Sequence, residues 1–339
     1  MLGILKDPYF SEHQANGFVE TGISLEEDLV EEIKEHYLTK ALGHNDFPKF
    51  FVDNQHQAYL EGAVLGFVFN TFPGAAKKLV KRFYDKAYSK AVYCDQACME
   101  KVLAQLMKQD FQRLFETRYI VASYDMYLRN SHRSPAAGIH TDLPNFHHFY
   151  ETENDLSLYI PLVDLDDDNG GRLSVLPESK LKVAGNVLLK LLYEHFSQIP
   201  ECLDEKGYVD PDRITARQMA AFIRSKPHQD LMTLYKGVIP LAKKQYAGDF
   251  RRTEEGRGRV LMFNNKNFHA AERWKNEQVD REVYVIRMFP LYDARIRLRQ
   301  KLHGTPVNNF LLDMQEGVVH RYPHPVDVTA IPEAEKLRL

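Results

Sequence analysis

The chain contains few cysteines, and this scarcity limits how it can be held together. Only Cys94, Cys98 and Cys202 occur in 339 residues. An odd and sparse set argues against a disulfide framework and is typical of a reducing compartment. No second cysteine pair is present to complete a zinc site with Cys94 and Cys98. We therefore interpret the cysteines as buried thiols.

The sequence also lacks an excess of one charge and lacks long apolar runs. Its formal net charge is -3, which does not indicate a general binder of nucleic acid or of anionic membranes. No apolar run reaches the ~20 residues needed to span a bilayer. The opening MLGILKDPYF has no apolar stretch of signal length. We predict a cytoplasmic protein with no nucleic-acid or membrane partner, and the oligomeric state stays open.

Aromatic residues, by contrast, are plentiful, with 20 Phe and 18 Tyr, so a packed interior is easily built. Apolar residues recur at helical spacing after Ser24, and Glu27 completes a capping box that predicts a helix start. Helical patterns continue through 74–90 and 95–116. Residues 1–117 are therefore predicted to be mainly helical.

From about residue 118 the pattern changes to β-branched and aromatic residues. Strands are predicted at 118–129, 156–165, 172–177, 258–264 and 281–289. We predict an α+β fold and one domain, 1–339, with jelly-roll strands in 118–180 and 256–290, a helical insertion or lid at 181–255, and an extension of short helix and proline-rich coil at 291–339.

Three residues form a candidate metal site. His140 and Asp142 are two apart, so on a strand they point to the same face. His269 follows another predicted strand, and a jelly roll brings such distant strand ends together. Two histidines and one carboxylate are the facial triad of non-haem Fe(II), which leaves coordination positions open. Zinc accepts the same donors, and a lone HxD triplet is a weak signal.

Two arginines strengthen that signal. Arg281 lies twelve residues after His269 at the head of an alternating strand, and Arg287 shares its face. A guanidinium directed into a barrel is costly unless it meets an anion, and its shape suits a carboxylate. An internal salt bridge is the alternative for each arginine.

In this order the motifs resemble those of the Fe(II)- and 2-oxoglutarate-dependent dioxygenases, in particular the phytanoyl-CoA dioxygenase-like branch. The resemblance covers about residues 15 to 290 and is carried by NGFVETGISLEEDLVEEI, GIHTD, LSLYIPLVDLDDDNGGRLSVLPESK, GRVLMFNNKNFHAAERW and REVYVIRMF. Two positions depart from the branch: Lys180 stands where histidine is usual, and Glu178 replaces a glycine. Neither position is a metal ligand in the family.

The resemblance implies a double-stranded β-helix (jelly-roll, cupin-like) core that uses Fe(II), 2-oxoglutarate and O2. It implies that His140, Asp142 and His269 bind Fe(II), and that Arg281 binds the distal carboxylate of 2-oxoglutarate. Arg287 is expected to assist that anion or to hold a substrate carboxylate, and which arginine holds the cosubstrate stays open. Tyr124 or Tyr127 is expected to hydrogen-bond the cosubstrate, with core packing as the alternative.

Related halogenases lack the carboxylate that Asp142 supplies, so the resemblance favours oxygenation. We expect hydroxylation of a small molecule, an amino acid or natural-product intermediate, with release of succinate and CO2; desaturation or cyclisation stays open. Phe146, His148 and Arg172 are expected to contact this substrate, with packing or solvent exposure as the alternative. Two rival functions remain: a zinc-dependent hydrolase or cupin-type isomerase with the same ligands, and a jelly-roll binding module without catalysis.

Overall fold

The computed structural model describes residues 4–43, 89–93, 95–132, 134, 138–142, 156–181, 186–254, 256–290, 301–302, 305–306 and 308–322. Phe146 and His148 lie outside the described residues, as does most of the helix predicted at 74–90.

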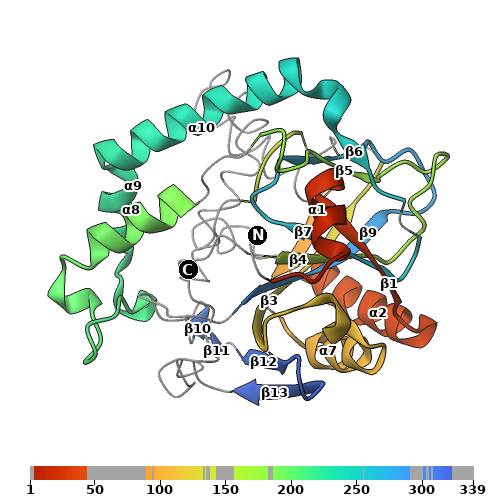
Figure 1. The fold of residues 1–339 in the computed structure, drawn as a ribbon, viewed down its shortest axis with the longest axis horizontal. Helices are drawn as coiled ribbons and strands as arrows, with labels where there is room; N and C mark the ends of the chain where they lie inside the picture. Colours follow the sequence, from red (N-terminus) through yellow and green to blue (C-terminus); the bar gives the residue numbers. More distant parts are fainter. Residues whose placement is uncertain are drawn as a thin grey trace.

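A large antiparallel sheet forms the centre of the molecule (Figure 1). Its strands follow the order β1-β7-β4-β9-β3-β12-β13, and β2 also pairs with β3. The bounds are β1 Phe18–Ser24, β2 Ser89–Tyr93, β3 Tyr119–Asn130, β4 Leu156–Pro161, β7 Arg259–Asn264, β9 Arg281–Pro290, β12 Asn309–Asp313 and β13 Val318–Tyr322.

A second, three-stranded antiparallel sheet has the order β6-β5-β8. Its strands are β6 Arg251–Arg252, β5 Leu173–Val175 and β8 His269–Ala271. An isolated bridge between His140 and His269 adds the segment 138–142 beside β8. A separate two-stranded hairpin consists of β10 Lys301–Leu302 and β11 Thr305–Pro306.

The alternation of β9 determines which residues face the small sheet. Val283 and Val285 belong to a buried cluster that also contains Leu173 and Val175 of the small sheet. Residues at even positions, such as Tyr284, belong to the cluster on the opposite face. Because side chains alternate along a strand, the arginines at positions 281 and 287 share the face of the two valines.

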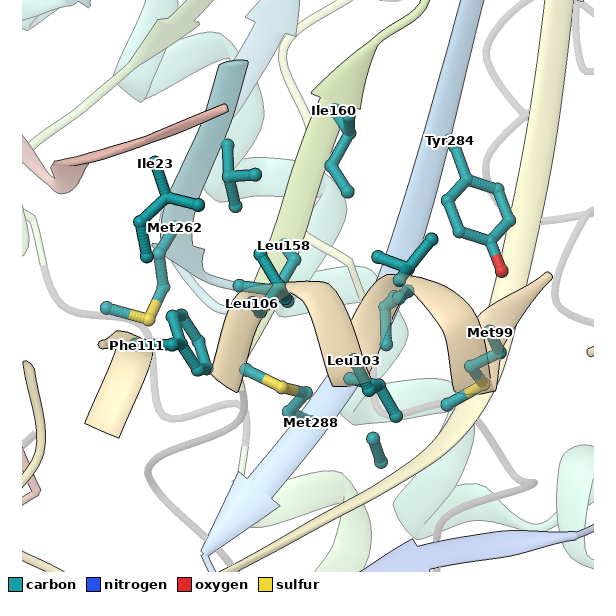
Figure 2. Close-up of a cluster of buried hydrophobic side chains, with 14 of the residues drawn as sticks. Ile23, Met99, Leu103, Leu106, Phe111, Leu158, Ile160, Met262, Tyr284 and Met288 are labelled. Carbon is teal, nitrogen blue, oxygen red and sulfur yellow. The ribbon is translucent and has the colours of Figure 1, made fainter. Parts of the chain in front are cut away.

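Helices cover that opposite face of the large sheet. They are α1 Tyr9–Asn16, α2 Glu27–Gly43 and α7 Met99–Lys108, followed by the 3-10 turn η1 Phe111–Leu114. Figure 2 shows Leu103 and Leu106 of α7 with Leu158 of β4 and Met288 of β9 in one buried cluster. Burial of these apolar side chains is what joins the helices to the sheet.

The predicted helical insertion contains three helices, α8 Asn186–Phe196, α9 Ala216–Arg224 and α10 Lys226–Gln245. Short 3-10 turns surround them, η2 Pro200–Cys202, η3 Pro211–Arg213 and η4 Ala247–Asp249. The insertion has a small core of its own, centred on Phe196 and Phe222. In Figure 1, α10 runs along the upper edge of the molecule. None of the helices in the described ranges combines the length and apolarity needed to cross a membrane.

The coarse prediction of an α+β fold with large antiparallel sheets is confirmed, but three local predictions are wrong. Ser24 is the last residue of β1, where it pairs with Arg259, so α2 begins at Glu27 and not at Ser24. Residues 89–90 belong to β2 rather than to a helix. β12 and β13 lie where short helix and coil were predicted. For β1, β2 and β12, hydrogen bonds to a strand distant in sequence outweigh the local pattern, and β13 then pairs with β12 as a hairpin.

Candidate metal and anion site

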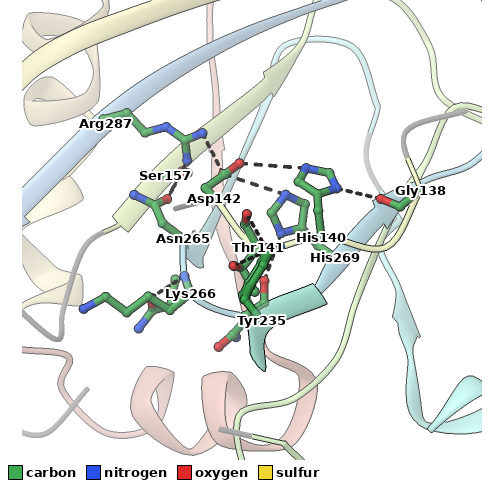
Figure 3. Close-up of polar contacts among 12 residues, drawn as sticks. Gly138, His140, Thr141, Asp142, Ser157, Tyr235, Asn265, Lys266, His269 and Arg287 are labelled. Carbon is green, nitrogen blue, oxygen red and sulfur yellow. Dashed lines mark hydrogen bonds and ion pairs between the residues drawn. The ribbon is translucent and has the colours of Figure 1, made fainter. Parts of the chain in front are cut away.

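The structure brings the three predicted metal ligands together. One ligand atom from each of His140, Asp142 and His269 lies within 4.8 Å of the others. His140 and His269 exchange backbone hydrogen bonds of 2.9 and 2.8 Å, and the Asp142 N–H donates to the Asn265 carbonyl at 2.8 Å. Backbone hydrogen bonds to β8 and to the turn before it therefore fix the separation of the three side chains (Figure 3).

Both histidines are oriented in the same way. Nδ1 of His140 lies 2.6 Å from the Gly138 carbonyl, and Nδ1 of His269 lies 2.9 Å from the Asn267 carbonyl. Because a carbonyl only accepts hydrogen bonds, Nδ1 is the donor in each ring, and a neutral imidazole in this orientation presents the lone pair of Nε2. The Nε2 atoms lie 3.8 and 3.7 Å from the two Asp142 oxygens. Two imidazole lone pairs and a carboxylate directed at one point fit a divalent metal ion.

Asp142 carries a negative charge at neutral pH. Burial raises the pKa of this carboxyl, but Arg287 and the two histidines outweigh burial and hold the pKa at about 2. Burial, reinforced by His140, lowers the pKa of His269 to about 4. The ligands are thus in the protonation states that a metal requires, a carboxylate and a neutral imidazole.

Arg287 forms an ion pair with Asp142, one of the three candidate metal ligands. Its Nη2 lies 2.6 Å from an Asp142 oxygen, and its Nη1 donates to the Asn265 side-chain oxygen at 2.5 Å. The same Nη1 contacts the Ser157 hydroxyl, which donates to Asn265. Arg287 therefore restrains the carboxylate ligand while its own charge is compensated.

Arg281 has a different environment. Its side chain is buried, with 5% of the residue exposed. Its Nε donates to the Gly171 carbonyl at 2.9 Å, its Nη2 contacts the Tyr159 hydroxyl, and its Cζ lies 5.9 Å from the Tyr159 ring centre. Among the described residues no carboxylate forms an ion pair with it. A buried cation with only neutral partners is costly, so this position suits a bound anion.

Two aromatic rings lie between Arg281 and His269, one of the candidate metal ligands. The Tyr159 ring lies 6.5 Å from the Phe263 ring, which lies 5.0 Å from the His269 ring. Tyr159 and Phe263 belong to the buried cluster between the two sheets. The candidate anion position and the candidate metal position therefore both lie next to the buried cluster between the two sheets.

Gly171 leaves room for the arginine. Its φ is +77°, and a Cβ built there would lie 2.8 Å from Trp274 and 2.9 Å from Cδ of Arg281. Only glycine adopts this backbone conformation readily and allows so close an approach. The second glycine of the predicted turn is therefore required by packing beneath Arg281.

The remaining predicted site residues differ in position. Tyr124 is buried in the cluster between the sheets, with its Cα paired to that of Arg287. Tyr127 faces the opposite core and stacks on Tyr37 with ring centres 5.6 Å apart. Arg172 bonds within its own turn, to the Leu165 carbonyl at 3.0 Å and to Asp167. The predicted substrate role of Arg172 stays a prediction.

Several residues of the site had not been singled out from the sequence. Tyr159 and Ser157 are the alternate residues of β4 between Leu156, Leu158 and Ile160, so the same alternation predicts that they face the arginines. Asn265 lies in the polar turn before His269, and nothing in its sequence context marks it. Tyr235 of α10 contacts Thr141, and no local signal predicts that contact.

Comparisons with known proteins give only remote likenesses. No protein-family model and no curated protein matches this sequence. Among solved structures, the chain is similar to the non-heme alpha-ketoglutarate-dependent carbocyclase SnoK from nogalamycin biosynthesis, with 13% identity over 84% of each chain and a TM-score of 0.45.

The epimerase SnoN, from the same biosynthesis and likewise described as non-heme and alpha-ketoglutarate-dependent, matches at 12% identity over 88% of this chain and 89% of its own, with a TM-score of 0.45. HygX from Streptomyces hygroscopicus, solved with nickel and 2-oxoglutarate bound, matches at 12% identity over 89% and 95%, with a TM-score of 0.41. Likenesses this remote assign no activity to the chain.

Proposed function

We propose that this chain is a non-haem Fe(II)- and 2-oxoglutarate-dependent oxygenase that hydroxylates a C–H bond of a small molecule. The observation that carries the proposal is the pairing of a converged His140, Asp142 and His269 set with the buried guanidinium of Arg281, which has no carboxylate partner among the described residues. The first element suits a divalent iron ion and the second suits an organic anion.

The chain contributes orientation and charge to this reaction. His140, Asp142 and His269 would hold the ion, and three protein ligands would leave it able to take up cosubstrate and dioxygen. When bound, Fe(II) with 2-oxoglutarate supplies activation of dioxygen, coupled to loss of CO2 and formation of succinate. Arg287 keeps Asp142 ionised and aligned, and it is part of the site for that reason.

Between the two arginines, Arg281 is the better holder of the distal carboxylate of 2-oxoglutarate. Its guanidinium meets a hydroxyl and a carbonyl, whereas Arg287 already pairs with Asp142. Tyr159 adds a hydroxyl beside Arg281, which supports recognition of a carboxylate by two groups. A zinc hydrolase or cupin-type isomerase has no need for such a position, so we favour the oxygenase.

The fold elements have proposed roles as well. We infer that the two antiparallel sheets form a double-stranded β-helix within one oxygenase domain, 1–339, and that the helical insertion covers the substrate. An amino acid or a natural-product intermediate is the proposed substrate, and Phe146, His148 and Arg172 remain candidates for contacting it.

Metal and cosubstrate binding test the proposal directly. Adding Fe(II) and 2-oxoglutarate without oxygen should produce a visible charge-transfer band in the unchanged protein. Asp142→Ala should remove the band and abolish succinate formation in the presence of substrate. Asp168→Ala, in the exposed acidic turn, is the control and should behave like the unchanged chain. A folded protein without any band, or full turnover by Asp142→Ala, would overturn the assignment.

A further inference from the structure

One side chain connects the helical insertion to the segment that carries two of the metal ligands. Tyr235 lies on α10, and its hydroxyl meets Thr141, the residue between His140 and Asp142. Figure 3 shows Tyr235 approaching Thr141 from the side away from the three ligands. This follows from strand alternation, because the ligands at positions i and i+2 point to one face and the residue between them points to the other.

The Tyr235 hydroxyl satisfies every polar group of Thr141. It lies 2.8 Å from the Thr141 N–H, 2.7 Å from Thr141 Oγ1 and 3.2 Å from the Thr141 carbonyl. A phenol accepts two hydrogen bonds and donates one. The backbone N–H and the threonine hydroxyl can therefore both donate to Tyr235 while Tyr235 donates to the carbonyl. Thr141 is buried, with 5% exposed, so loss of this partner would leave its polar groups without a hydrogen bond and out of reach of water.

The tyrosine is itself held by packing. Its ring stacks on Phe268, the neighbour of His269, with ring centres 6.4 Å apart and planes 17° apart. Both rings belong to an apolar cluster that includes Leu176 beside the small sheet and Ala242 of α10. The insertion thus has its own core at one end, and at the other end it packs through this cluster against residues beside the small sheet.

We propose that Tyr235 is a positioning residue for the metal site, through which α10 holds the backbone of Thr141 and so aligns His140 and Asp142. The inference rests on the proposed function, since it concerns the metal ligands of that same site. On the other edge of the segment, His269 and Asn265 supply the backbone hydrogen bonds. Tyr235 completes the restraint from the insertion side.

The proposal has a reciprocal consequence. If α10 favours the arrangement that binds metal, then metal binding must stabilise the attachment of α10 by the same free energy. Occupation of the site should therefore slow hydrogen exchange in residues 226–245. A tyrosine that served only to stabilise the fold would not transmit this effect.

Anaerobic Fe(II) titration, in the presence of 2-oxoglutarate, and hydrogen exchange of the full chain provide the test. Tyr235→Phe keeps the ring and removes the hydroxyl. We expect it to weaken Fe(II) affinity about tenfold, the lower end of the 10–100-fold loss seen when groups that orient metal ligands are removed. The slowing of exchange in α10 on Fe(II) binding should be reduced together with the affinity.

Two further variants separate positioning from folding. Tyr246→Phe removes a hydroxyl from the same apolar cluster, next to the end of α10, and should leave Fe(II) affinity unchanged. If Tyr235→Phe does not fold, Thr141→Val removes only the side-chain partner and should weaken affinity in the same direction. Thr141→Ser keeps the hydroxyl and should restore it.

The outcomes are distinguishable. If the unchanged chain binds Fe(II), and Tyr235→Phe and Thr141→Val match it in affinity and in exchange of α10, the positioning role is overturned while the proposed function stands. If the unchanged, folded chain binds no Fe(II), the proposed function fails and the role of Tyr235 fails with it.

Discussion

Single residues set the chemistry of the site through contacts that are mostly to backbone. The two histidine rings are turned by carbonyls two residues before them, and Arg281 is held by the Gly171 carbonyl. These carbonyls are part of the backbone, so the orientation of the site's side chains depends on the conformation of the turns that carry them. Conformationally restricted residues near the site should therefore be sensitive to small substitutions.

Gly171→Ala tests this sensitivity. Its Cβ would meet Trp274 and Arg281 at under 3.0 Å, so Arg281 must move. We expect at least a tenfold rise in KM for 2-oxoglutarate and a loss of stability of roughly 1–3 kcal/mol, because overpacking and strain at positive φ add. Succinate assays over a range of cosubstrate concentrations and urea unfolding measure the two effects.

Gly207→Ala is the matched control for this substitution. Gly207 also has positive φ, +81°, but no heavy atom lies within 4 Å of the Cβ position. It should therefore show the backbone strain without the change in KM. Equal KM values for both variants and the unchanged chain would contradict the role of Arg281 as the cosubstrate anchor.

His13 gives a prediction on pH. It is fully buried in α1, and neither ring nitrogen has a hydrogen-bond partner among the residues that the structure describes. Burial lowers its pKa from 6.5 to about 4, although Glu178 acts in the opposite direction. Between pH 6.5 and pH 4, His13 is therefore protonated in the unfolded chain but not in the folded chain. The free energy of unfolding falls as the pH falls through this range.

Urea unfolding at pH 7 and pH 5 should reveal a loss of about 2 kcal/mol that is due to His13. His13→Gln, which cannot titrate, should reduce the pH dependence by that amount. An unchanged pH dependence in His13→Gln would show that the ring binds a proton equally well in the folded and the unfolded protein.

At the scale of single residues, the sequence was sufficient to select the three side chains that converge as candidate metal ligands, but not the residues that support them. An HxD triplet and a distant histidine are visible as residue types and spacings. Asn265 and Tyr235 act through contacts made only after distant segments meet, so no spacing identifies them. The proposal that Arg281 rather than Arg287 holds the cosubstrate also required the structure, because it depends on which arginine already has a carboxylate partner.

Secondary structure elements on the helical side of the sheet meet at one buried carboxylate. Asp125 of β3 accepts hydrogen bonds from the hydroxyls of Tyr37 in α2 and Tyr284 in β9, and from the Gln96 N–H before α7. Four separate segments of the chain are thereby joined by one side chain. Such an arrangement is costly to break, because each stranded donor adds its own desolvation penalty.

Asp125→Leu should reveal that cost. The substitution removes the acceptor that three donors share and leaves only the 3.5 Å contact between the Tyr37 and Tyr284 hydroxyls, so we expect a loss of about 3 kcal/mol in the free energy of unfolding. Tyr284→Phe removes one donor and its contact with Tyr37, but it leaves the hydrogen bonds from Tyr37 and Gln96 to Asp125 in place. It should cost about 1 kcal/mol, and urea denaturation of both variants measures the difference. Equal effects of the two variants would mean that Asp125 does not act as a shared acceptor.

Helices and strands were predictable where the spacing of apolar residues within the element itself indicated its conformation. The strands with strong alternation, such as 281–289, and the apolar helices of the insertion are confirmed within a few residues. The helix start at Ser24 was wrong, because a strand pairing with β7 competes with the capping signal. β12 was missed for the same reason: it owes its conformation to its neighbours β3 and β13.

On the scale of the whole molecule, the helical insertion has an apolar cluster of its own and shares a second one with the two-sheet core. In the shared cluster, Tyr235 and Ala242 of α10 lie with Phe268 and Leu176 of the core. The sequence predicted the helical block and its place between strands. It did not predict where the block attaches, since that depends on packing between faces that are far apart in the chain.

The single tryptophan of the chain acquires a practical meaning from its position. Trp274 is buried, donates from Nε1 to the Val279 carbonyl at 2.7 Å, and lies with Arg281 against Gly171. No other tryptophan is present to mask its emission. The protein therefore carries a natural optical reporter beside the proposed carboxylate anchor, and binding of the proposed cosubstrate there should change the fluorescence of Trp274 without any added label.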